Sequence, residues 1–200
     1  MTTFISNLIL NYGIGAYIII FIVLFIETGI VITPFLPGDS LLFLAGTFLV
    51  ISKINPIIII MLFSIAAITG DFVNYFLGRK YGLKLFSNSY TKRLFKEDYL
   101  IKTENFFEKH GNIAIFLGRF IPIIRTFIPF TSGIARMSYK KFVTYNMLGG
   151  LCWVSVGVLA GYFFGSIEIV KKNFELIMMM IVVISLIPVF VTLLREKVAK

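Results

Sequence analysis

Long apolar stretches separated by short polar segments dominate this sequence. Three of them match or exceed the roughly 20 residues that a helix needs to cross a bilayer, namely residues 14–33, 54–77 and 142–164. A fourth stretch, residues 174–194, has a similar length and ends just before a short basic segment. The pattern predicts an all-α polytopic membrane protein with about four spanning helices.

Residues 34–51 are too short, and too interrupted at their start, to cross as a straight helix. Pro34, Pro37 and Gly38 open the segment, and about a dozen apolar residues follow before the chain becomes polar. A dozen helical residues rise about 18 Å, little more than half of the hydrocarbon core. We therefore predict a re-entrant hairpin, with Asp39 starting its helical arm. At that position a capping role and a functional role are compatible.

Residues 112–135 are apolar apart from two arginines near the middle of the segment. Arg119 and Arg125 stand three residues on either side of Pro122. Prolines at 122 and 129 and a glycine at 133 are expected to break any straight helix. An arginine near the bilayer centre costs roughly 2.5–3.5 kcal/mol, so it usually faces a polar cavity and has a function. The alternative is that both side chains snorkel to the interface and only anchor the segment.

Residues 79–110 form the longest polar segment, in which basic residues outnumber acidic ones. The positive-inside rule predicts that this linker is cytoplasmic. Within it, residues 91–109 have aromatic side chains on one helical face, which favours an interfacial helix. His110, followed by Gly111, is interpreted as the end of that helix in preference to a proton relay.

The order of these segments predicts two halves of opposite orientation within a single membrane domain of residues 1–200. The first half covers residues 1–78 and the second covers residues 111–200, with the linker between them. Basic loops on both sides of residues 112–135 place both ends of that segment in the cytoplasm, so it is also predicted to be re-entrant. Two re-entrant hairpins that enter from opposite faces are typical of an inverted-repeat transporter with a site near the midplane.

Composition supports a membrane protein and argues against several other classes. The chain is 58% hydrophobic and 14% charged, whereas soluble domains are about 25% charged. The net charge of +9 is therefore assigned to loops beside anionic lipid headgroups, and a nucleic-acid partner is not expected. The single cysteine, Cys152, and the single histidine argue against a disulfide and against a metal centre. We expect no metal and no cofactor.

Two acidic residues in apolar surroundings are the natural partners of the two arginines. Glu27 lies inside the first spanning stretch, and Asp39 starts the arm of the first hairpin. If the two hairpins meet, both acids lie near Arg119 and Arg125. The two negative and two positive charges then cancel, which removes most of the free-energy cost of burying each of them.

Further polar residues in apolar stretches are secondary candidates. Asp71 and Asn74 share one face of the helix predicted for residues 54–77. Asp71 is either an ion ligand or an interfacial partner of Arg79 or Lys80, and the sequence does not separate the two. The remaining secondary candidates lie in the 142–164 stretch, and they are Asn146 and Trp153.

Several short motifs follow one another in a fixed order along the chain. They are Glu27, Pro34-x-x-Pro37-Gly38-Asp39, Gly70-Asp71-x-x-x-Tyr75-x-x-Gly78-Arg79-x-x-Gly82, His110-Gly111, Gly118-Arg119-Phe120-Ile121-Pro122-x-x-Arg125-Thr126, and Asn146 with Gly149, Trp153 and Gly157. Together they resemble the DedA family of bacterial membrane proteins. In that family the carboxylates matching Glu27 and Asp39 and the arginines matching Arg119 and Arg125 are the functional residues of the membrane domain.

The resemblance implies a multi-pass lipid transporter or flippase of the bacterial cytoplasmic membrane. The resemblance is strongest to the members that return undecaprenyl phosphate across the membrane for cell-wall synthesis. It also implies that transport depends on the proton gradient. Other members are implicated in moving phosphatidylethanolamine, so a general phospholipid flippase or scramblase is the alternative. A phosphate monoester carries about −1.5 to −2 charges. Two guanidiniums can hold it by bidentate hydrogen bonds, which is consistent with such a substrate.

Other classes are less consistent with these residues. In a proton or cation channel, two arginines in the pore would repel cations. A purely structural membrane scaffold is a further alternative. Intramembrane aspartyl proteases need Gly-x-Gly-Asp, but Leu36 and Ile68 occupy the first glycine position of the two Gly-Asp motifs. We expect no enzyme. The expected partners are the membrane and an anionic lipid, and an oligomer is compatible with the sequence.

Overall fold

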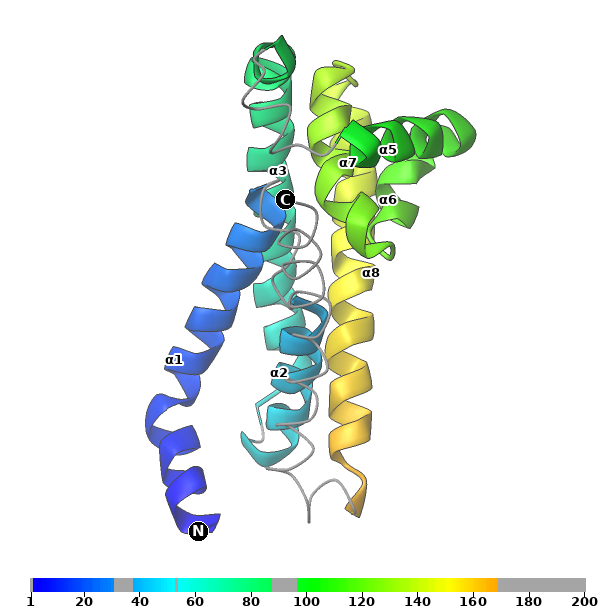
Figure 1. Cartoon of the computed structure of the whole chain (residues 1–200). Coiled ribbons are helices and arrows are strands. Elements are labelled where there is room, and N and C mark those ends of the chain that lie inside the picture. The colour runs from blue at the N-terminus through cyan, green and yellow to red at the C-terminus, as the bar shows by residue number, and fades with distance from the viewer. Residues whose placement is uncertain (1, 31–37, 53, 88–96, 169–200) are drawn as a thin grey trace, which may run out of the picture. The chain divides into compact units, whose positions relative to one another are not determined.

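The computed structural model describes residues 2–30, 38–52, 54–87 and 97–168, which form helices joined by short connections, with no strand among them (Figure 1). The helices are α1 (Thr2–Gly29), α2 (Gly38–Ser52), α3 (Pro56–Ser87), α5 (Glu97–His110), the 3-10 helix η1 (Gly111–Ile113), α6 (Ala114–Gly118), α7 (Pro122–Ile134) and α8 (Tyr139–Gly165). The expected all-α class is confirmed for the described residues.

Two of the described helices are long and apolar enough to cross a membrane, judged by length and composition. They are Pro56–Gly82 within α3 and the whole of α8. Both coincide with predicted spans, although α3 starts and ends later than predicted. It continues to Ser87, so residues 79–87 are helical and not part of an irregular linker. The glycines at 78 and 82 do not end α3, because both pack against the α7 segment.

The apolar parts of α1 and α2 are shorter, covering residues 15–29 and 38–50. α1 begins at Thr2 and ends at Gly29, before the predicted end at residue 33. α2 has Asp39 in its first turn, as predicted, where a carboxylate interacts favourably with the helix dipole. The proline turn of the first predicted hairpin lies outside the described residues, and so does the predicted span 174–194.

The chain divides into two compact units, each built from separate parts of the sequence. The first unit comprises residues 1–20, 35–60 and 155–200, and the second unit comprises residues 21–34 and 61–154. In the first unit, α2 and the end of α8 pack closely. The Thr47 hydroxyl donates to the Gly161 carbonyl at 3.1 Å. A Cβ atom at Gly46 or Gly161 would meet backbone atoms of the facing helix. Small residues thus allow close helix contact.

In the second unit, α3 packs against α7 through a second pair of glycines. A Cβ atom at Gly78 or at Gly133 would overlap a backbone carbonyl of the opposite helix. Beside this contact, the Tyr75 ring stacks on Phe142 with 4.3 Å between the ring centroids. Both rings are fully buried and belong to the hydrophobic core of this unit. The core supports the helices on which the charged residues lie.

The predicted interruption of residues 112–135 is present, and it lies between α6 and α7. α6 ends at Gly118, and residues 119–121 form a turn. Pro122 is the first residue of α7, where its missing N–H would have no partner in any case. The residue before it, Ile121, is extended, as expected before a proline. The local chemistry of Pro122 therefore determines the break.

The expectation that residues 129 and 133 also break the helix is wrong. Pro129 and Gly133 both lie inside α7. A proline removes one helical hydrogen bond and costs about 3 kcal/mol in a helix interior. Packing of α7 on α3 compensates, since Pro129 is buried and a Cβ atom at Gly133 would overlap the Tyr75 carbonyl oxygen of α3.

The helix predicted for residues 91–109 corresponds to α5, whose first residue is Glu97, while residues 88–96 lie outside the described part. α5 packs mainly on α7 and lies across the direction of α3 and α8 (Figure 1). His110 ends the helix, with its Nδ1 3.0 Å from the Phe106 carbonyl oxygen. Gly111 follows with φ +58°. A left-handed glycine after the last residue is a common helix end, so this interpretation of His110 is confirmed.

We expect Gly78→Ala to destabilise the protein by about 1–3 kcal/mol, because the added methyl group overlaps the backbone of α7. Gly15→Ala is the matched control, since a Cβ atom there meets nothing within 4 Å. It should be neutral or stabilising by up to about 1 kcal/mol, as alanine is the better helix former. Thermal unfolding in detergent micelles measures both. Equal unfolding temperatures for the two variants would contradict the close α3–α7 contact.

Candidate functional site

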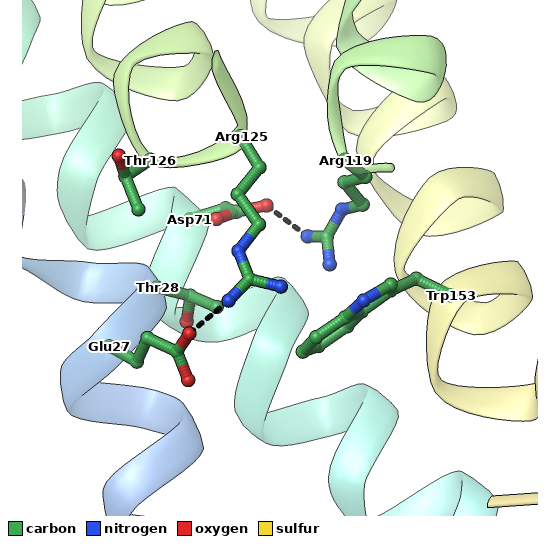
Figure 2. Close-up of a pocket in the computed structure, with 7 residues that line it drawn as sticks. All are labelled: Glu27, Thr28, Asp71, Arg119, Arg125, Thr126 and Trp153. Atoms are coloured by element: carbon green, nitrogen blue, oxygen red, sulfur yellow. Dashed lines mark hydrogen bonds and ion pairs between the residues drawn. The ribbon is translucent and has the colours of Figure 1, made fainter. Parts of the chain in front are cut away.

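Four charged side chains from different helices gather inside the second unit (Figure 2). Glu27 lies in the last turn of α1, Asp71 lies midway along α3, Arg119 lies in the turn after α6, and Arg125 lies in the first turn of α7. They form two ion pairs, Arg125 Nη2 with Glu27 Oε1 and Arg119 Nη2 with Asp71 Oδ2. The side chains are at most 10% exposed. Each buried charge thus has an opposite charge in contact.

Arg119 is held by α8 as well as by α3. Its Nη2 donates to Asn146 Oδ1 at 2.7 Å and to the Ala67 carbonyl at 3.4 Å, in addition to the bond with Asp71. Asn146 is fully buried, and its Nδ2 donates to the Ile68 carbonyl at 3.2 Å. One turn of α3 and one residue of α8 therefore fix a single guanidinium nitrogen.

A second buried asparagine joins the two helices that carry the other ion pair. Asn74 Nδ2 donates to the Thr28 carbonyl at 3.2 Å and to the Thr126 carbonyl at 2.9 Å. These threonines directly follow Glu27 and Arg125 in the sequence. Asn74 therefore holds together the backbone segments from which the Glu27–Arg125 pair extends.

The indole of Trp153 lies beside both arginines. The Arg125 Cζ is 5.1 Å from its ring centroid, and the Arg119 Cζ is 6.0 Å away. Figure 2 shows the ring between α8 and the two guanidiniums. A cation over an indole face gains roughly 0.5–2 kcal/mol, and more when it is desolvated. The ring therefore helps to hold both positive charges inside the protein.

These side chains enclose a small cavity with room for about one water molecule. Its lining consists of the charged residues, Trp153 and two threonines, and the full set is Glu27, Thr28, Asp71, Arg119, Arg125, Thr126 and Trp153. The lining is polar on one side and aromatic on the other. In this conformation each of the two guanidiniums contacts a carboxylate.

Local backbone features bring these side chains together. The turn before Pro122 places one arginine on each side of the α6–α7 break. On α8, a Cβ atom at Gly149 would lie 3.1 Å from Arg119 Cδ, and a Cβ atom at Gly150 would lie 3.4 Å from Arg119 Cζ. The absence of side chains at these two glycines leaves the space that Arg119 occupies.

The site combines most of the residues that the sequence singled out, but not with the expected pairing. Glu27 lies beside Arg125, as expected. Asp71, predicted to be an ion ligand or a partner of Arg79 or Lys80, pairs with Arg119. Arg79 instead donates to the Tyr75 hydroxyl at 3.0 Å. Eight residues along a helix correspond to about 12 Å, too far for Asp71 and Arg79 to reach each other easily.

The secondary candidates Asn74, Asn146 and Trp153 all contact the four charged residues or the backbone beside them. Asp39 lies in the first unit, in the first turn of α2, and its pairing with the arginines stays a prediction. Sequence reasoning missed the two threonines of the cavity. Their positions in the sequence could have indicated them, because each threonine directly follows a charged residue of the site.

The described residues contain no group of three histidine, cysteine or carboxylate side chains that could hold a metal ion. Chemically, the arrangement offers two guanidiniums whose partners are carboxylates. Such pairs can exchange an internal anion for an external one, or release a carboxylate that takes up a proton. Anion binding is the chemistry that these groups support best.

Two described helices are long and apolar enough to cross a membrane, and one of them carries Asp71 of a buried ion pair, as expected of a helical membrane protein with an internal charged site. The chain belongs to the DedA family of membrane proteins, since the family model of the VTT domain matches residues 36–163, well over half of the sequence. The resemblance drawn from the motifs is thereby confirmed.

Several known proteins are similar over most of their length. Protein DedA of Escherichia coli K12 is 48% identical over 194 residues, covering 96% of this chain and 88% of its own. An uncharacterized membrane protein of Mycobacterium tuberculosis is 42% identical over 179 residues, covering 88% and 78%. Inner membrane protein YghB of E. coli K12 is 32% identical over 170 residues, covering 85% and 77%. No solved structure matches the chain.

We expect Asp71→Leu to destabilise the protein by about 3–5 kcal/mol, because it leaves Arg119 buried without its counter-charge. The double variant Asp71→Leu/Arg119→Leu should recover most of this loss, since two apolar residues in place of a buried pair are often neutral. Unfolding in detergent micelles measures both. Glu108→Gln, at an exposed position of α5, is the control and should change stability by less than about 0.5 kcal/mol. Additive effects of the two leucines would contradict the pairing.

Proposed function

We propose that this protein transports anionic membrane lipids, and that its substrate is undecaprenyl phosphate, which it returns across the bacterial cytoplasmic membrane for cell-wall synthesis. The observation that carries the proposal is the pair of buried arginines, each in contact with a carboxylate, around one small cavity. Membership of a family that includes an inner membrane protein supports the location.

The charge balance of the site favours a phosphate monoester over a diester. Arg119 and Arg125 carry two positive charges, and a monoester carries about −1.5 to −2. A diester such as phosphatidylethanolamine has a single phosphate charge and an amine of opposite sign. One monoester headgroup can therefore replace both carboxylates as counter-charge, whereas one diester replaces only one of them.

Binding requires the ion pairs to open. A cavity with room for about one water molecule is too small for a phosphate group. The side chains of Glu27 and Asp71 must therefore give way to the headgroup beside the guanidiniums. A carboxylate that loses its partner is left buried and charged, which is costly unless it takes up a proton. Proton uptake on substrate binding is thus a physical route by which a proton gradient drives transport.

In the membrane we propose two re-entrant hairpins that enter from opposite sides, at residues 34–51 and 112–135. The break between α6 and α7 at Pro122 supports the second hairpin. Spanning helices around them complete an inverted repeat, so that the headgroup crosses through the polar site while the polyprenyl chain stays in lipid. Asp39, at the start of α2, is assigned to charge balance and proton coupling with Glu27.

Competing functions make different predictions for the same site. A channel for protons or cations would be opposed by two arginines beside its carboxylates. We do not propose an enzyme, because no step of bond cleavage is needed to use these groups. A phosphatidylethanolamine or general phospholipid scramblase would accept diesters as readily as monoesters. Substrate selectivity therefore separates the proposal from its nearest alternative.

The single tryptophan of the chain gives a direct test, because Trp153 lies against both arginines. In phosphatidylcholine nanodiscs, dodecyl phosphate should change the tryptophan emission saturably, and its methyl diester should bind at least about tenfold more weakly. Arg119→Lys and Arg125→Lys keep the charge but lose the planar fork, so each should weaken binding of the monoester by about tenfold or more.

Arg136→Lys makes the same chemical change at an exposed position and should bind as the wild type does. Trp153→Phe removes the single tryptophan of the chain, so any change in emission that remains comes from the nanodisc and not from this protein. Equal affinity for monoester and diester would favour a general phospholipid scramblase. Absence of saturable binding by the wild type would refute the proposed substrate class.

Proton coupling is tested by flux in proteoliposomes with and without an imposed pH gradient. Glu27→Gln and Asp39→Asn mimic the protonated carboxylates, so they should still bind dodecyl phosphate while lipid movement loses its response to the gradient. Glu104→Gln, at an exposed position of α5, should respond as the wild type does. If both amide variants respond normally, Glu27 and Asp39 serve charge balance alone and Asp71 becomes the coupling candidate.

A further inference from the structure

The hydrogen bonds of Arg119 are distributed unevenly over its guanidinium. All three run from Nη2, to Asp71, to Asn146 and to the Ala67 carbonyl. Asp71 and Ala67 lie one helical turn apart on α3, while Asn146 reaches in from α8. One terminal nitrogen is thus fixed from two helices.

The other terminal nitrogen of Arg119 has a different environment. In Figure 2 it points away from Asp71 and toward the ring of Trp153. A Cβ atom at Gly150 would lie 3.4 Å from this Nη1, so the nitrogen lies close to α8 at a position where a glycine leaves room for it. Because Arg119 and Trp153 both line the cavity, Nη1 is directed toward the proposed position of an anionic headgroup.

Asn146 has the properties of a group that orients its neighbour. It is fully buried, it accepts from Arg119 at 2.7 Å, and its own amide is held by the Ile68 carbonyl at 3.2 Å. Both ends of its side chain are therefore used, one to fix its own position and one to fix the guanidinium. A residue that serves only to fill space needs neither bond.

We propose that Asn146 is a positioning residue that, with Asp71, holds Arg119 by Nη2 and so presents Nη1 to the phosphate group of the substrate. The inference rests on the proposed function and refines it, because Arg119 then contributes one nitrogen to the headgroup in place of a two-nitrogen fork. Arg119 keeps its contact with Asn146 when Asp71 is protonated or displaced, so the guanidinium stays in place through the exchange.

The amide of Asn146 matters because it is neutral. Glu27 and Asp71 balance Arg119 and Arg125, so these four groups have no net charge. An asparagine adds an acceptor for Arg119 without altering that balance. An aspartate of the same shape would also accept from Nη2, but it would add a negative charge next to the binding position. Asparagine thus orients the arginine without repelling an anion.

Two substitutions test this assignment by tryptophan emission with dodecyl phosphate in phosphatidylcholine nanodiscs. Asn146→Leu removes the acceptor, so Arg119 loses its orientation and affinity for dodecyl phosphate should fall about tenfold, the effect of one hydrogen bond to a charged group. Asn146→Asp keeps the shape and the acceptor but adds a charge. It should weaken binding of the doubly charged monoester more than binding of its methyl diester, which lowers the selectivity between the two probes.

Two controls separate positioning from general effects. Ser138→Asp adds the same charge at an exposed position just before α8, and Thr144→Ala removes an exposed hydroxyl within the helix. Both should keep the affinity and the selectivity of the wild type. Unfolding temperatures are measured for every variant, because a purely structural role lowers the unfolding temperature without altering selectivity.

The outcomes separate this inference from the proposed function. Weaker binding by Asn146→Leu together with the altered selectivity of Asn146→Asp supports the positioning role. Wild-type affinity and selectivity in either Asn146 variant overturns it and leaves the proposed function intact. Failure of the wild type itself to bind dodecyl phosphate overturns both. If Asn146→Leu does not fold, Asn146→Asp decides the question through the ratio of its two affinities.

Discussion

A charged guanidinium cannot be left alone among apolar helices, and this constraint organises the second unit. Removing an ion from water costs several kcal/mol even after the protein relaxes, so each buried arginine needs an opposite charge in contact. Glu27 supplies it to Arg125, and Asp71 supplies it to Arg119. Because these residues lie on α1, on α3 and at the α6–α7 break, satisfying the charges brings three parts of the chain together.

Two buried asparagines add hydrogen bonds that hold the charged residues in place. Asn74 donates to two backbone carbonyls, one next to each member of the Glu27–Arg125 pair. Asn146 accepts a hydrogen bond from Arg119, and its own amide donates to the Ile68 carbonyl, which links α8 to α3. Neither asparagine adds a charge. The asparagines thereby hold the helices together without changing the net charge of the site.

Local chemistry explains what the sequence could predict, and tertiary contact explains what it could not. The spanning length of α8 and the break at Pro122 depend on neighbouring residues, and both were predicted. The partner of Asp71 depends on packing, since Arg119 lies 48 residues further along the chain. Sequence proximity favoured Arg79 instead. The expected break at Pro129 failed for a related reason, because burial of α7 on α3 outweighs the lost hydrogen bond.

Stability alone does not account for two buried ion pairs. Apolar residues of similar volume usually leave a protein as stable as a buried pair does, or more stable, and leucine enters a membrane helix at no cost. A carboxylate–guanidinium contact has a property that two leucines lack, because the arginine can exchange its partner for another anion. The displaced acid then takes up a proton. Two such pairs around a cavity beside Trp153 have the chemistry that the proposed binding of a doubly charged headgroup requires, which gives them a role that stability alone does not.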